Sequence, residues 1–205
     1  GCELIDTDGN RYLDGVSSLW CNLHGHNHPK INAAIIEQLQ RVAHVTSLGV
    51  SNPTTVRLAA RLVEIAPDGL NHVFFSSDGA SSVEVALKMA FQYWRQCEHP
   101  QPEKNLFIAL GRAYHGDTLG SVSVGGVARF HQMFAPLLFE VIHTSIPDSY
   151  HLPPGVSCED ACDHYLAELE QILAEHHHRS AAVIIEPLVQ GAAGIWPQPV
   201  SFLSG

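Results

Sequence analysis

Hydrophobic and polar positions follow two different periods along the chain, and the helical period dominates the first 70 residues. Apolar side chains recur at helical spacing in two stretches, which predict one helix from Ile31 and a second one opened by Asn52-Pro53. Before them, residues 3–14 place two short apolar runs around Asp8-Gly9-Asn10, and Gly and Asn tolerate the positive φ of a tight turn. The pattern therefore predicts a surface hairpin followed by two helices, the second ending at Pro67-Asp68-Gly69.

A regular succession of strands and helices is predicted after residue 70. Short apolar runs predict strands at residues 72–75, 106–110, 141–145 and 181–186. Helical spacing predicts helices at residues 82–96, near Asp117 and after Ser157, where Asp160 completes a capping box. Because strands that alternate with helices pair in parallel, the expected fold class is α/β, with a mainly parallel sheet and helices on both faces.

The composition excludes several classes of protein. Lys and Arg together number 11 and Asp and Glu 21, so the net charge of −10 argues against nucleic acid and anionic membranes as partners. With 45% hydrophobic and 16% charged residues the chain is typical of a well-buried globular fold, and no apolar run reaches the length of a membrane span. The five cysteines are odd in number and scattered, so we expect a reducing cytoplasm rather than a secreted disulfide framework.

The residues that follow the strands are the candidates for chemistry, because open parallel sheets bind ligands beyond the carboxyl ends of their strands. Residues 76–82 form a Ser- and Gly-rich turn before a helix, which suits a phosphate but is also the composition of a plain capped turn. Tyr114 follows one strand and suits a flat cofactor, while Glu186 ends another strand, where an unpaired buried carboxylate would be costly. Together they describe a pocket for a planar phosphorylated cofactor.

Two groupings of histidine and cysteine have the residue types of a metal site. Residues 24–28 place three histidines at alternate positions, but the glycine among them and the proline after them predict a loop, so histidines bonded to the backbone are favoured. Cys158 and Cys162 lie one helical turn apart without a second pair, which favours packing residues. No metal is therefore expected.

Four segments resemble a known family, namely DGVSSLWCNLHGHNHP (14–29), SVEVALKMAFQYW (82–94), AYHGDTLGSVSVGG (113–126) and IIEPLVQGAAG (184–194). Over essentially its whole length the chain resembles class III (ω-type) pyridoxal-phosphate aminotransferases. The resemblance implies the large-domain α/β sheet of type I PLP-dependent transferases. Residues 1–45 would be an amino-terminal small-domain segment and residues 46–205 the first part of the PLP-binding large domain. It also implies pyridoxal 5'-phosphate as the cofactor, small-molecule substrates and a homodimer.

The same motifs assign roles to individual residues. By resemblance, the backbone N–H groups of Gly79 and Ala80 bind the cofactor phosphate, and Tyr114 lies against the pyridoxal ring and lines the substrate site. The substrate-contacting aromatic stretch of the family falls on Leu19 and Trp20, although many members have Trp at the position of Leu19. Glu186 is expected near the substrate.

Two residues of the family's chemistry have no counterpart in these motifs. The Asp that pairs with the pyridine nitrogen and the Schiff-base lysine lie further along the chain of family members than Gly205. Lys30, Lys88 and Lys104 are the lysines present, and none follows a strand, so no catalytic residue is assigned. We therefore expect the sequence to represent the first half of an enzyme, cut at both ends and inactive alone.

Within the family, the four segments are most similar to a branch that acts in biotin synthesis. This resemblance implies amino transfer to 8-amino-7-oxononanoate, giving 7,8-diaminononanoate, with S-adenosylmethionine or lysine as the amino donor. Two alternatives stay open, a class III transaminase acting on other ω-amino acids and a non-catalytic fragment that binds a phosphate.

Overall fold

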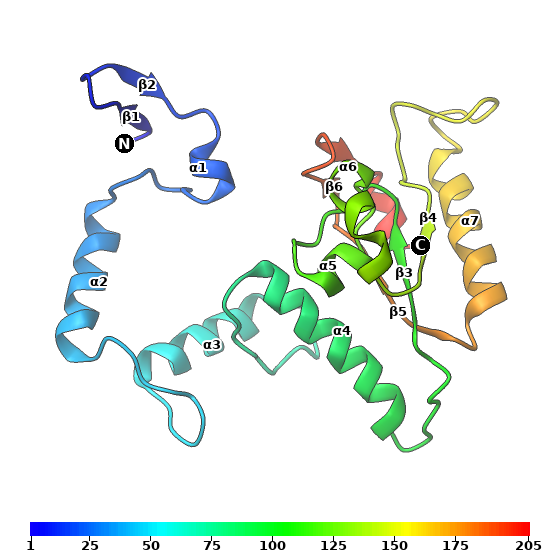
Figure 1. Ribbon diagram of the computed structural model, residues 1–205, viewed down its shortest axis with the longest axis horizontal. Helices are drawn as coiled ribbons and strands as arrows, with labels where there is room; N and C mark the ends of the chain where they lie inside the picture. The colour runs from blue at the N-terminus through cyan, green and yellow to red at the C-terminus, as the bar shows by residue number, and fades with distance from the viewer. The chain divides into compact units, whose positions relative to one another are not determined.

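The chain divides into two compact units, Gly1–Val73 and Phe74–Gly205. A computed structural model describes both units over residues 1–205, and Figure 1 labels their elements. The boundary predicted at about residue 45, between a small-domain segment and the cofactor domain, falls inside the first unit and stays a prediction.

The first unit contains the hairpin and the two helices that the sequence predicts. Strands β1 (Glu3–Ile5) and β2 (Arg11–Leu13) pair antiparallel with Glu3 opposite Leu13. Helices α2 (Pro29–Arg41) and α3 (Pro53–Ile65) both begin with a proline at their first position. The Asn52 side chain caps α3 by accepting two backbone N–H groups, which satisfies donors that have no partner within the helix.

The short segment α1 (Ser17–Trp20) is a left-handed turn. The φ angles of its four residues lie between 52° and 68°, a region that costs an L-residue about 1–2 kcal/mol. Leu19 and Trp20 lie on this turn with 73% and 62% of their surface exposed. The turn therefore holds the backbone strained while it presents two large apolar side chains to solvent.

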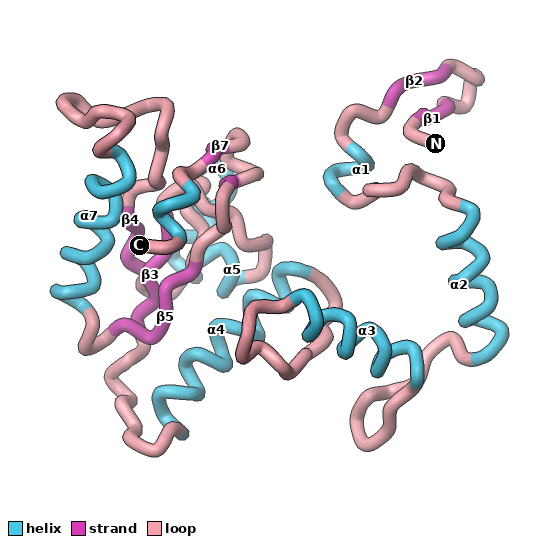
Figure 2. Tube along the Cα trace, turned by 180° about the vertical axis from the view of Figure 1, so that it is seen from behind, coloured by secondary structure: helices cyan, strands magenta, loops and turns pink.

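The second unit is built on a parallel sheet of three strands in the order β4-β3-β5. These strands are β3 (Leu106–Leu110), β4 (Val141–Thr144) and β5 (Ser180–Ile184), and Phe107 lies opposite Val141 on one side and Ala182 on the other. Figure 2 shows the three strands side by side in magenta, with a helix along the β4 side. The three predicted strands after residue 100 are therefore confirmed.

The strand predicted at residues 72–75 is wrong. These residues form no regular element, and Phe74 and Phe75 are 72% and 42% exposed. A strand is stable only when a neighbouring strand satisfies its backbone N–H and C=O groups, and no strand pairs with this segment. The apolar run by itself does not supply that partner.

Several helices surround the sheet, and the three predicted ones are present with shifted bounds. The capping box predicted at Ser157 and Asp160 is wrong, because the helix begins only at Ala161, without a side-chain cap, and the two side chains bond to each other in the turn before it. No helix combines the length and the apolar character needed to cross a membrane. The remaining elements are α4 (Gly79–Gln96), α5 (Leu119–Ser123), α6 (Ala128–His131), η1 (Gln132–Leu137), α7 (Ala161–His176), η2 (Val200–Leu203) and the hairpin of β6 (Val189–Gln190) and β7 (Trp196–Pro197).

The central strand β3 is buried along its whole length, and its alternate side chains face opposite sides of the sheet. On one side Phe107 and Ala109 pack with Leu87 of α4. On the other side Leu110 packs with Ala161 of α7. Helices therefore cover both faces of a parallel sheet, and the predicted α/β fold class is confirmed.

Candidate active site

The turn before α4 and the loop after β3 line an open cavity of about 720 Å³. Its lining combines the residues predicted to bind a phosphate with the tyrosine predicted to cover a ring. The lining residues are Asp78, Gly79, Ala80, Val83, Tyr114, His115, Gly116, Asp117 and Thr118.

The first turn of α4 presents backbone donors to this cavity. Asp78 is the N-cap, and its carboxylate accepts the N–H of Ser81 at 2.7 Å, which together with the Ser81 hydroxyl lowers the pKa of Asp78. The amides of Gly79 and Ala80 come first in the helix and have no carbonyl partner within it. Both residues line the cavity, so the positive end of an 18-residue helix borders it.

Gly116 brings the loop after β3 into direct contact with this turn. A Cβ at residue 116 would lie only 2.5 Å from the Cβ of Ala80, and the φ of Gly116 is +127°. Both the conformation and the spacing require glycine. The contact holds the loop beside the two helix amides.

Three contacts hold Tyr114 at the cavity. Its backbone N–H donates to Oε1 of Glu186 at 2.7 Å, and its hydroxyl donates to Oδ2 of Asp117 at 2.8 Å. The ring of Phe130 lies nearly perpendicular to the Tyr114 ring, with the centroids 6.2 Å apart. The hydrogen bond to Asp117, then burial and the Asp117 charge, raise the pKa of Tyr114, so its hydroxyl stays protonated at neutral pH.

Glu186 follows β5 rather than ending it, and its carboxylate is engaged with backbone. One oxygen accepts the Tyr114 amide, and the other accepts the N–H of Gly191 at 2.9 Å. This half-buried carboxylate is therefore paired, as the cost of burial requires. Its predicted contact with substrate stays a prediction.

His115 lies beside Tyr114 with its Nε2 atom buried and without a hydrogen-bond partner. Burial lowers the pKa of His115, against the opposing effect of the Glu186 charge. At neutral pH this imidazole is therefore uncharged and adds no cation to the cavity.

The remaining predicted site residues are in the other unit, and the lysines of the second unit lie outside the cavity. Leu19 and Trp20 belong to the first unit, so their contact with substrate stays a prediction. In the second unit Lys88 is exposed on α4. The Lys104 ammonium donates to backbone carbonyls, including that of Ser180 at 3.3 Å, and lies 4.5 Å from the centre of the Trp94 ring. Neither lysine lines the cavity.

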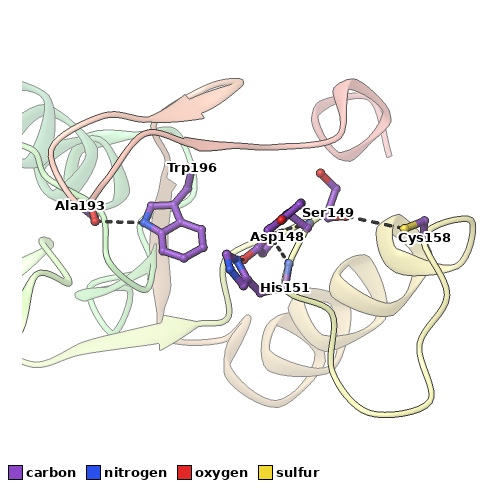
Figure 3. Close-up of polar contacts among 7 residues, drawn as sticks. Asp148, Ser149, His151, Cys158, Ala193 and Trp196 are labelled. Carbon is purple, nitrogen blue, oxygen red and sulfur yellow. Dashed lines mark hydrogen bonds and ion pairs between the residues drawn. The ribbon is translucent and has the colours of Figure 1, made fainter.

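A second cavity of about 500 Å³ includes Asp148, His151 and Trp196 in its lining. The Asp148 carboxylate accepts the N–H groups of Tyr150 and His151 and lies 3.1 Å from Nδ1 of His151, while the Trp196 indole donates to the Ala193 carbonyl (Figure 3). Burial acts to raise the pKa of Asp148, but these hydrogen bonds outweigh it and lower the pKa. Asp148 and the Trp196 indole therefore already have hydrogen-bond partners within the protein.

The histidines and cysteines do not form a metal site. Nowhere in the protein do three His, Cys, Asp or Glu side chains come together as a metal ion requires. All five cysteines are free thiols, and the Cys158 sulfur contacts the Ser149 carbonyl oxygen at 3.8 Å (Figure 3).

Comparisons with known proteins agree with this architecture. The Aminotransferase class-III family matches residues 1–205. An adenosylmethionine-8-amino-7-oxononanoate aminotransferase of Nitratidesulfovibrio vulgaris is 51% identical over 208 residues, covering 100% of this chain and 38% of that protein. The crystal structure of an enzyme of the same name from Methanocaldococcus jannaschii superposes with a TM-score of 0.86 at 40% identity, covering 99% of this chain and 43% of that one.

A third similar protein is an amine transaminase from an uncultivated Pseudomonas species, solved in a PLP-bound form. It has a TM-score of 0.91 and 36% identity, and the match covers 100% of this chain and 46% of that one. The chain belongs to the class III aminotransferases, a family of PLP-dependent enzymes. It spans about two fifths of the length of the curated relative from N. vulgaris. The predicted family, enzyme class and cofactor are thereby confirmed.

The residues at the cavity fit pyridoxal phosphate. Gly79 and Ala80 line the cavity at the N-terminus of α4, where free amides and the helix dipole suit the phosphate, and the Tyr114 ring at the same cavity suits the pyridine ring. No lysine or arginine lines the cavity, so the backbone supplies the positive potential.

Sequence reasoning assigned no role to Asp117, Glu84 or Phe130. Asp117 comes three residues after Tyr114 in the same loop, and this short spacing is the signal that points to a partner for the hydroxyl. Glu84 contacts the Tyr114 loop from a position 34 residues earlier in the chain than Thr118, so no local signal points to it. Phe130 contacts the Tyr114 ring from a short helix that the pattern did not predict.

Proposed function

We propose that the complete protein transfers an amino group to 8-amino-7-oxononanoate, forming 7,8-diaminononanoate, with S-adenosylmethionine or lysine as the donor. Aminotransferases of that name are 51% and 50% identical to the whole of this chain. One observation supports the proposal most directly: the α4 amides and the Tyr114 ring line one cavity at the carboxyl edge of the sheet. A ligand with an anionic end and a planar ring fits that arrangement.

When it is bound, pyridoxal phosphate withdraws electrons from the carbon that gains or loses the amino group. The chain's own residues bind and orient it. Gly79 and Ala80 would hold the phosphate through their N–H groups, with the α4 dipole adding to the attraction. The Tyr114 ring would lie against the pyridine ring, while its protonated hydroxyl donates to Asp117.

Substrate handling is assigned to Tyr114, Leu19, Trp20 and Glu186. Glu186 acts by holding the Tyr114 backbone and thereby sets where the ring lies, and the acceptor passes over that ring. Leu19 and Trp20 supply apolar surface for the aliphatic chain of the acceptor, since both side chains are exposed on their turn. We further propose that the protein works in the cytoplasm as a homodimer.

An assay of the complete gene product tests this function. Purified protein loaded with pyridoxal phosphate is incubated with 8-amino-7-oxononanoate and with either S-adenosylmethionine or lysine, and 7,8-diaminononanoate is measured by mass spectrometry. We expect the product with one of the two donors. Its absence with both donors, from protein that binds the cofactor, would refute the proposed acceptor.

A second candidate function is transamination of other ω-amino acids or amines. It is favoured by the amine transaminase that superposes with a TM-score of 0.91. In the same assay this candidate predicts turnover of a simple amine with pyruvate and none with 8-amino-7-oxononanoate. The non-catalytic alternative predicts neither reaction and no stable absorbance from bound pyridoxal phosphate.

Light scattering in solution tests the proposed homodimer.

A further inference from the structure

Glu84 lies in the second turn of α4 and holds the segment that follows Tyr114. Its Oε1 atom accepts hydrogen bonds from the Thr118 hydroxyl at 2.6 Å, from the Gly120 N–H at 2.7 Å and from the Ser121 N–H at 3.3 Å. One carboxylate oxygen therefore binds three donors. Two of these donors are backbone groups at the start of α5, where a negative charge is favourable.

The fit around Glu84 is close because residue 120 has no side chain. A Cβ on Gly120 would overlap the Glu84 carboxylate. Any larger residue would displace the Glu84 carboxylate from the start of α5. The three hydrogen bonds thus depend on direct contact between the two elements.

The same segment contacts α4 a second time, one turn nearer its beginning. The Ser121 hydroxyl donates to the Ala80 carbonyl at 3.2 Å, and Gly116 packs against the Ala80 side chain. The loop that carries Tyr114 is therefore attached to α4 at residues 80 and 84. Two attachments one turn apart fix both the distance and the orientation of the loop relative to the helix.

We propose that Glu84 is a positioning residue of the cofactor pocket. Its carboxylate sets where Tyr114 lies relative to the amides of Gly79 and Ala80, so that one ligand is held at its ring and at its phosphate together. Glu84 does not line the cavity and acts only through the loop. The identity of the ligand rests on the proposed function, whereas the attachment of the loop does not.

A purely structural role for Glu84 predicts a different result. If the carboxylate only caps α5, its loss affects residues 118–121 and leaves the tyrosine unchanged. If it positions Tyr114, its loss moves a residue four to seven positions away from the atoms it binds. The environment of Tyr114 therefore distinguishes the two roles.

The test uses the complete protein labelled with ¹⁵N-tyrosine, with the Tyr114 signal assigned by Tyr114→Phe. Glu84→Ala is compared with Glu84→Gln, which keeps an oxygen acceptor, and with Glu170→Ala, which removes an exposed helix carboxylate that forms no hydrogen bond. We expect the Tyr114 amide signal to shift or broaden in Glu84→Ala and to stay in place in the other two. Thr118→Val, which loses one donor only, should move it in the same direction by less.

Ligand binding supplies the second measurement. In Glu84→Ala the affinity for pyridoxal phosphate should fall about tenfold, because the protein no longer binds the ring and the phosphate of the ligand at the same time. The affinity for inorganic phosphate, which has no ring, should stay within about twofold of the wild-type value. Glu84→Gln should restore the affinity for pyridoxal phosphate.

The outcomes separate the two proposals. An unchanged Tyr114 signal in Glu84→Ala and Thr118→Val would overturn the positioning role. A shifted Tyr114 signal in a protein whose wild type does not bind pyridoxal phosphate would refute the proposed function and leave the positioning role intact. If Glu84→Ala lost the same affinity for inorganic phosphate as for pyridoxal phosphate, Glu84 would support α4 alone. That result would also overturn the positioning role.

Discussion

The Glu186 carboxylate accepts the backbone N–H of Tyr114 at 2.7 Å, although the two residues are 72 positions apart in the chain. The bond joins the loop after β3 to the segment after β5, at the edge where α/β sheets bind ligands. Since the second Glu186 oxygen accepts the Gly191 amide, the carboxylate orients backbone on both sides. Glu186, which the sequence predicts to contact substrate, thus holds two backbone segments of the pocket in place.

Removing this link should loosen the pocket. In Glu186→Ala the N–H groups of Tyr114 and Gly191 both lose their acceptor, which should lower the free energy of unfolding by about 1–3 kcal/mol. Glu186→Gln keeps one good acceptor and should lose less. Urea unfolding measures both variants. Equal stability of Glu186→Ala and wild type would show that water replaces the carboxylate without cost.

The phosphate role of the α4 amides can be tested by removing one N–H group. Gly79→Pro suits the helix, because proline is favoured at its first position and Asp78 already has the extended backbone that precedes a proline. The affinity for pyridoxal phosphate, measured by absorbance titration, should fall about tenfold without a loss of thermal stability. Gly79→Ala retains the N–H and serves as the control. If both variants bind equally well, the Gly79 amide does not hold the phosphate.

The Tyr114 hydroxyl should matter more for turnover than for folding. Tyr114→Phe keeps the ring and removes only the group that donates to Asp117, so kcat/KM of the complete enzyme should fall about tenfold with little change in Tm. Tyr150→Phe is the matched control, because Tyr150 is 83% exposed and its hydroxyl forms no hydrogen bond. Unchanged kinetics in Tyr114→Phe would exclude the hydroxyl from the mechanism.

Contact between the Tyr114 loop and α4 should depend on Gly116. An alanine at this position would place its Cβ 2.5 Å from the Cβ of Ala80 and would strain the backbone, so Gly116→Ala should cost about 3 kcal/mol or more. Gly155→Ala isolates the strain, because Gly155 has a φ of +84° with nothing within 4 Å of its Cβ, and should cost about 1 kcal/mol. Similar losses in the two variants would argue against close packing at residue 116.

Acid stability should depend on Asp148. Because hydrogen bonds lower the pKa of Asp148 in the folded protein, this carboxylate stabilises the fold above its ordinary pKa of about 3.9, and the contribution is lost as pH falls through the lower folded value. Asp148→Asn should therefore be less stable than wild type at pH 7, and the difference should shrink as the pH falls below about 4. Urea unfolding at several pH values measures this, with Glu103→Gln, an exposed carboxylate without hydrogen bonds, as the control. A pH-independent difference would contradict the assignment.

The sequence by itself determined the local elements and the class of the fold. The hairpin, the helices α2, α3, α4 and α7 and the three strands of the sheet follow from the spacing of apolar residues and, for α3, from its Asn52 cap, because those signals act between neighbours in the chain. Strand and helix order then implied a parallel sheet, and the rule for ligand sites in such sheets pointed to residues 76–82, Tyr114 and Glu186, while the family resemblance assigned the phosphate to Gly79 and Ala80. Family motifs added the cofactor.

Only the tertiary structure decided which of these residues act on one another. The bond from Tyr114 to Glu186 and the three bonds from Glu84 to residues 118–121 join segments 34 to 72 positions apart, and no local pattern encodes such pairs. The predicted strand at 72–75 was wrong for the same reason, since a strand needs a neighbour that its own residues do not specify. Backbone hydrogen bonding and close packing between distant segments settle what a sequence pattern leaves open.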